Sequence, residues 1–287
     1  MFVGQPTLRV EDDALLAGQQ RFFDDLSLAG LAHVAFVRSP YGHARILSID
    51  VAPAQAMPGV FGTLTGDEIA QLTKPQRGRV PLPNSPLVYA LAYEAVRYVG
   101  EPVVAVAALD RGLAEDAADA IEIEYEPLPA VVDPEEALKP DAPLVFEEVG
   151  SNVLWHDTFP YGDLAGAFAA ADRVISERFT IHRYSSTPLE TFGSMAQYEP
   201  ASGGFTIWGH AQQPAQDMNT VVAALGLSPG QVRFIVPPLG GGFGNKGRPL
   251  CHIVTAVLAR KIGRPVKWVE DRKESLLGLG HAADGIM

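Results

Sequence analysis

Residues 231–262 read QVRFIVPPLGGGFGNKGRPLCHIVTAVLARKI, with three consecutive glycines between two runs rich in apolar residues. Alternating and β-branched residues at 231–238 predict a strand. A proline at the start and Gly263 at the end bracket an amphipathic run, which predicts a helix over 249–261. The glycine loop between them therefore joins a strand to a helix.

The loop reads GGGFGNKG over residues 240–247. Glycine allows positive φ and a close approach of the backbone to a ligand. Successive N–H groups beside a helix N-terminus form a cradle for a phosphate or an oxo group. A tight structural turn is the plainer alternative, although the large apolar side chain of Phe243 is not typical of a flexible linker.

Two familiar phosphate motifs were compared with the loop. A Walker A loop fails because Gly247, not serine or threonine, follows Lys246. The dinucleotide pattern G-x-G-x-x-G is matched by Gly242, Gly244 and Gly247, and Glu270 ends the next predicted strand at a suitable distance for a ribose contact. Prolines between the strand and the loop argue against it. A dinucleotide-binding domain using residues 242–247 stays open as an alternative.

The composition narrows the class of protein. The net charge of −12 disfavours a nucleic-acid partner, because a phosphate backbone would be repelled. No run of about 18 apolar residues occurs, so we expect no membrane span. The single cysteine, Cys251, can form no internal disulfide and cannot hold an iron–sulfur cluster. No histidine or cysteine pair has zinc-site spacing, so we expect no metal held by direct protein ligation. A cytoplasmic protein is the default expectation.

The remaining pattern predicts an α+β fold. We expect further strands at 30–38, 45–51, 102–108, 121–126, 171–184, 205–209 and 266–270, and helices at 54–57, 111–121 and 214–225. Prolines spaced over 127–143 indicate a boundary. The predicted parts are an N-terminal arm at 1–25, a first domain at 26–138, a linker at 139–160 and a second domain at 161–287.

At the glycine loop the sequence resembles the molybdopterin-binding large subunits of the xanthine dehydrogenase, aldehyde oxidase and carbon monoxide dehydrogenase family. The resemblance extends in order over residues 37–69, 96–138, 184–200, 206–218, 240–246 and 265–276. The PLET segment at 188–191 and GFGNK at 242–246 look most like the carbon monoxide dehydrogenase branch. The resemblance implies an α/β hammerhead domain at 26–138, followed by the N-terminal, incomplete part of the first molybdopterin-binding domain at 161–287.

The resemblance also implies roles for single residues. Gln212 aligns with a glutamine whose amide contacts an oxygen ligand of molybdenum. Gly241, Gly242, Phe243 and Gly244 align with the loop whose amides meet that oxygen and the pterin. A surface amide and an ordinary core phenylalanine are the plain alternatives. No catalytic residue is expected within this chain, since the general-base glutamate would lie beyond residue 287.

The implied function is oxidative hydroxylation of a small carbon substrate (carbon monoxide, an aldehyde or a heteroaromatic) with water. Gly247 stands where xanthine dehydrogenases commonly carry a purine-contacting glutamate, which disfavours a xanthine-like substrate. The implied cofactor is molybdenum-molybdopterin, free or as its cytosine dinucleotide. Iron–sulfur and FAD subunits are the implied partners, with the rest of the large subunit or a second polypeptide that supplies it. The chain would be a truncated fragment or half of a split subunit, inactive alone. A non-catalytic assembly module is a further alternative.

Overall fold

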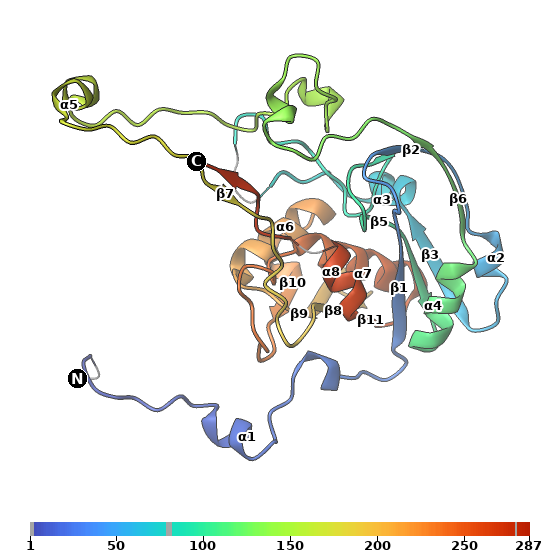
Figure 1. The fold of residues 1–287 in the computed structure, drawn as a ribbon. Coiled ribbons are helices and arrows are strands. Elements are labelled where there is room, and N and C mark those ends of the chain that lie inside the picture. The colour runs from blue at the N-terminus through green and yellow to red at the C-terminus, as the bar shows by residue number, and fades with distance from the viewer. Residues whose placement is uncertain (1–2, 79–81, 279) are drawn as a thin grey trace.

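The computed structural model describes residues 3–78, 82–278 and 280–287. Its centre is a seven-stranded mixed sheet (Figure 1). The strand order is β10 (Val232–Ile235), β9 (Gly204–Gly209), β8 (Gly193–Glu199), β11 (Val266–Val269), β1 (Ala32–Arg38), β5 (Pro102–Ala108), β3 (Val60–Thr65). β10 pairs with β9, and β1 with β11, in parallel; the other neighbours are antiparallel.

This sheet joins strands from both halves of the chain. In the parallel pair of β1 with β11, Ala32 lies opposite Val266. The sheet therefore continues across the predicted boundary between the two domains. The domain limits at 26–138 and 161–287 stay predictions, while the predicted α+β class is confirmed.

Helices cover the two faces of the sheet. The apolar run of β5 divides between them, because successive side chains of a strand point to opposite faces. Ala105 and Ala107 belong to the core beneath α7 (Pro249–Ile262), whereas Val104 and Val106 belong to the core beneath α4 (Arg111–Asp119). The remaining helices of the body are α2 (Ala52–Gln55), α3 (Gly66–Leu72), α6 (Pro214–Leu225) and α8 (Arg272–Gly278).

Two smaller sheets and two projecting arms complete the fold. One sheet has the order β4 (Ala95–Val96), β2 (Ala44–Asp50), β6 (Glu122–Pro127), and the other pairs β12 (Gly285–Ile286) with β7 (Thr180–Ile181). The N-terminal arm with α1 (Asp12–Leu16) and the segment with α5 (Leu164–Ala170) extend away from the body (Figure 1). No helix within the described ranges is long and apolar enough to cross a membrane.

The predicted strand at 171–184 is wrong. Only Thr180–Ile181 pairs there, and the alternating apolar residues Val174 and Ile175 are 56% and 70% exposed. Alternation makes a strand only where a neighbouring strand takes up its hydrogen bonds and one face is covered, and most of this segment lacks both. Strand β8, a buried strand of the main sheet, was not predicted from the sequence.

Candidate functional site

The glycine loop connects β10 to α7, as the sequence predicted. Gly241 and Gly244 adopt φ values of 97° and 89°, which favour glycine. Phe243 is also left-handed, with φ of 52°, and its side chain is 73% exposed. A large side chain in this region costs about 1–3 kcal/mol, and such strain gathers at ligand sites. The loop therefore presents an exposed aromatic ring on a constrained backbone.

Gln212 lies directly against this loop. A Cβ atom on Gly242 would be 2.8 Å from the Gln212 Cδ, so a side chain there would force the Gln212 amide to shift. The Gln212 side-chain Oε1 accepts the Lys246 N–H at 3.0 Å, and its main-chain N–H donates to the Lys246 carbonyl at 2.8 Å. Because Oε1 is engaged, the Nε2 end of the amide is the donor on this exposed side chain that has no acceptor among the described residues.

The structure thus brings all five predicted site residues together. Gly241 supports the exposed ring, since a Cβ on it would lie 2.7 Å from the Phe243 Cε2 atom. Within the described part of the chain, no group accepts the main-chain N–H of Gly241, Gly242, Phe243 or Gly244. This row of donors beside an amide NH₂ group suits the oxygen atoms of an anion or of a pterin-bound metal group.

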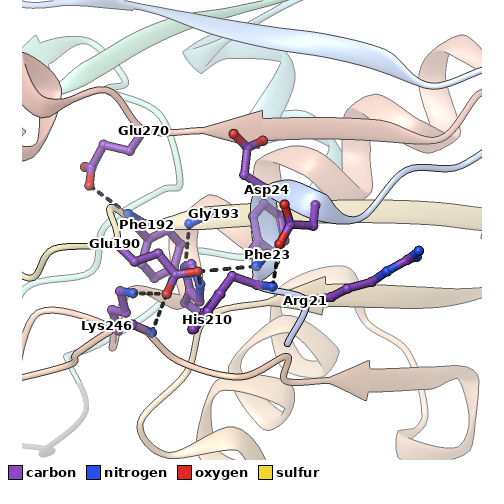
Figure 2. Close-up of polar contacts among 12 residues, drawn as sticks. Arg21, Phe23, Asp24, Glu190, Phe192, Gly193, His210, Lys246 and Glu270 are labelled. Carbon is purple, nitrogen blue, oxygen red and sulfur yellow. Dashed lines mark hydrogen bonds and ion pairs between the residues drawn. The ribbon is translucent and has the colours of Figure 1, made fainter. Parts of the chain in front are cut away.

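Beneath the loop, Glu190 receives polar groups from several segments (Figure 2). Its Oε2 accepts the Gly240 N–H at 2.7 Å and lies 2.5 Å from the Lys246 Nζ. Its Oε1 accepts the Phe23 N–H at 3.3 Å and lies 3.0 Å from the His210 Nε2, although that pair is not aligned for a full hydrogen bond. The carboxylate therefore ties the loop to β9 and to the N-terminal arm.

The electrostatics of this cluster favour a carboxylate beside a lysine. Burial alone would raise the pKa of Glu190, but His210 and Lys246 outweigh it and lower that pKa to about 2. Burial lowers the pKa of Lys246 and of His210, and Glu190 opposes both shifts. The His210 Nδ1 accepts the Gly193 N–H at 2.8 Å, which assigns the proton of the neutral ring to Nε2.

The sequence analysis missed Glu190 and His210 as site residues and considered Lys246 only as a Walker A lysine. A glutamate within the apolar segment PLETF, residues 188–192, could have flagged a buried partner for that lysine. These residues meet through the tertiary fold, and their spacing in the sequence does not reveal the contact.

Glu270 is not available as a ribose ligand. Its side chain is 1% exposed, and its oxygens accept from the Arg248 Nη2 at 2.9 Å and the Phe192 N–H at 3.2 Å. The dinucleotide alternative needed this carboxylate to be free. The buried, paired state of Glu270 therefore counts against a dinucleotide site at residues 242–247.

A separate cleft lies apart from the loop. A cleft of about 560 Å³ is lined by Arg97, Tyr98, Arg183 and His281 among others, and it shares no lining residue with the loop. Among the described residues, no three histidine, cysteine or acidic side chains cluster as metal ligands.

Comparisons with known proteins match both halves of the chain. A model of the aldehyde oxidase and xanthine dehydrogenase a/b hammerhead domain matches residues 17–129, and a model of the molybdopterin cofactor-binding domain matches residues 145–287. The carbon monoxide dehydrogenase large chain of Afipia carboxidovorans is 38% identical over 96% of this chain. The nicotine 6-hydroxylase large subunit of Paenarthrobacter nicotinovorans is 36% identical over 98%. The chain spans about 36% of the length of the first of these relatives and 35% of the second.

Solved structures share the fold. Quinoline 2-oxidoreductase from Pseudomonas putida 86 superposes with a TM-score of 0.92 at 38% identity, over 99% of this chain and 36% of that one. The carbon monoxide dehydrogenase of Oligotropha carboxidovorans gives a TM-score of 0.87 at 36% identity, over 98% and 36%. With a hammerhead domain and a molybdopterin cofactor-binding domain in sequence, the chain belongs to the xanthine dehydrogenase and aldehyde oxidase family of molybdopterin-binding large subunits.

Proposed function

We propose that this chain is part of the large subunit of a molybdenum hydroxylase, and that Gln212 and residues 241–244 hold its molybdenum-molybdopterin cofactor. One observation supports this above all. The Gln212 amide packs on Gly242 beside main-chain N–H groups that have no acceptor among the described residues. Donors with no internal partner suit a ligand rich in oxygen atoms.

The cofactor, when bound, supplies a Lewis acid and an electron acceptor for oxidative hydroxylation with water. The chain positions it and provides hydrogen bonds. Main-chain N–H groups of residues 241–244 would donate to its oxygen atoms, and the Gln212 Nε2 would donate beside them. The Lys246 N–H holds the Gln212 Oε1 and so fixes which end of the amide faces the cofactor. The exposed Phe243 ring would be available to cover one side of the bound group.

The complete enzyme extends beyond these residues. We propose that the rest of the large subunit, or a second polypeptide that supplies it, provides the general-base glutamate and most of the pterin surface. Iron–sulfur and FAD subunits would carry electrons away. The substrate class is a small electron-poor carbon compound, in keeping with relatives named for carbon monoxide and nicotine. A cytosine dinucleotide form of the cofactor and a cytoplasmic location belong to the same proposal, as does the absence of turnover by this chain alone.

Replacement of Gly242 by alanine in the full complex tests the cofactor role. The new methyl group would collide with Gln212, so we expect about 10–100-fold weaker cofactor retention, the range typical when groups around a metal centre are disturbed. Molybdenum per protein by elemental analysis is the measurement. Gly230→Ala is the control, because a Cβ there meets nothing within 4 Å. Full molybdenum content in Gly242→Ala would contradict the proposal.

Gln212→Ala separates the cofactor role from a pure assembly role. An assembly module would keep the turnover rate of the complex unchanged in this variant. A cofactor contact predicts a lower rate with the subunits still assembled, measured on the purified complex.

A further inference from the structure

The glycine loop is held at both of its ends by one oxygen atom. The Glu190 Oε2 accepts the Gly240 N–H at 2.7 Å on the strand side of the loop and pairs with the Lys246 Nζ at 2.5 Å on the helix side. Residues 241–245 lie between these two anchors. The carboxylate therefore closes the loop into a ring, with Phe243 on the outer, exposed side.

The anchoring residue is itself fixed. The Phe23 N–H and His210 approach its other oxygen, and the His210 ring is held through Nδ1 by Gly193. The Phe23 ring packs on His210 with centroids 5.1 Å apart and fills the space that a side chain at Gly193 would need. Glu190 thus has little freedom to move relative to the sheet.

An ion pair at this place is costly. The Lys246 side chain is 1% exposed and that of Glu190 18%, and apolar residues of similar volume often stabilise such a site equally well. What the pair provides instead is a defined geometry. It sets the separation of Gly240 and Lys246, and Lys246 in turn holds Gln212 through its main-chain N–H and carbonyl.

We propose that Glu190 is a positioning residue, which holds the loop and Gln212 in the shape that accepts the cofactor by anchoring Gly240 and Lys246 together. This inference rests on the proposed function. It assigns no contact between Glu190 and the cofactor, since the carboxylate acts from beneath the loop.

The test is the paired substitution Glu190→Met with Lys246→Met in the assembled holoenzyme. Removing both partners leaves no unpaired charge in the site, so the core should stay folded. Hydrogen exchange is followed by mass spectrometry in residues 239–247 and, for comparison, in β8. Molybdenum release on dilution is followed in parallel. The control is Arg38→Met with Glu274→Met, a pair with side chains 13% and 19% exposed that engages Gly100 and Trp268 rather than the loop.

We expect faster exchange in the loop with β8 unchanged, and about 10–100-fold faster loss of molybdenum. The control pair should show neither effect. If the ion pair has only a structural role, the paired substitution leaves both loop exchange and molybdenum retention at wild-type values, and that result would overturn the inference.

A fallback variant keeps the test decisive, and the wild-type complex separates failure of the anchoring from failure of the proposed function. If the methionine pair does not fold, Glu190→Asp keeps the charge but withdraws it by one methylene group, and unchanged loop exchange and retention in that variant would also overturn the inference. Wild-type complex that contains no molybdopterin would refute the proposed function, whereas wild-type complex that holds it no better than the methionine pair would refute the anchoring alone.

Discussion

The two faces of the central sheet bury different kinds of side chain. Under α4 the core consists mainly of small apolar residues, with Val104, Val106 and Ala117 fully buried. On the α7 side the apolar core adjoins buried polar and charged side chains. Among these are Ser194, His210, Lys246, His252, Thr255 and Glu270.

The difference separates structural from functional demands. Polar burial costs free energy unless each group finds a partner, and alanine and valine stabilise a sheet without that requirement. Among these polar side chains, Lys246 and His210 lie around Glu190, beside the glycine loop and Gln212. The α4 face acts as support, and the α7 side holds the geometry of the candidate site.

Trp268→Ala should give the largest effect, because Trp268 is the largest fully buried side chain among the described residues. Trp268 is 1% exposed and contacts Phe36 edge-on with ring centroids 4.9 Å apart and Phe192 with centroids 6.0 Å apart. We expect the free energy of unfolding to fall by about 3–5 kcal/mol. Chemical denaturation followed by fluorescence measures it. A loss below 1 kcal/mol would mean that this side carries little of the stability.

Ala117→Leu probes how tightly the opposite face is packed. Ala117 of α4 is fully buried against β1 and β5, so three added heavy atoms must displace neighbours. We expect destabilisation by about 1–3 kcal/mol with molybdenum content of the complex unchanged. Equal or greater stability would show that the α4 face contains spare volume, and lost molybdenum would show that the two faces are coupled.

The stability of the folded protein should depend on pH through His252, which lies on the α7 side. Burial lowers the pKa of His252 to about 3, from an ordinary value of 6.5, and the charge of Arg248 acts in the same direction. The unfolded chain binds a proton near pH 6.5 while the folded protein does not. Stability is therefore lost as pH falls below 6.5, by up to about 1.4 kcal/mol per pH unit for this residue.

His252→Gln should remove that part of the slope. Thermal or urea unfolding between pH 6.5 and 4.5 measures it, since Glu190 has an ordinary pKa of 4.5, a lowered folded value, and adds its own loss only at lower pH. The same slope in wild type and variant would show that His252 does not contribute.

Much of the fold could be predicted from the sequence where local signals are strong. The helix at 214–225 and the loop between a strand and the helix starting at Pro249 match the structure. The strand at 171–184 failed because alternation records only that one face could be covered. Strand β8 was missed because its position between β9 and β11 depends on residues distant in sequence.

The candidate site was predictable only in part. Gln212 and residues 241–244 were identified through the resemblance, and the structure places them together. The anchoring residue Glu190 was not identified, because its partners Lys246, His210 and Phe23 are far from it in the chain. Pair interactions of this kind depend on tertiary structure, and no periodicity in the sequence encodes them.

The parallel pairing of β1 with β11 has a consequence for biosynthesis. More than two hundred residues separate Ala32 from its neighbour Val266. At about 5–20 residues per second, a ribosome needs about 10–50 s to deliver the second strand after the first. During that interval the edge of β1 has no permanent neighbour and is a template for incorrect pairing between nascent chains. The yield of correctly folded protein should therefore depend on chaperones that shield this edge until synthesis reaches β11.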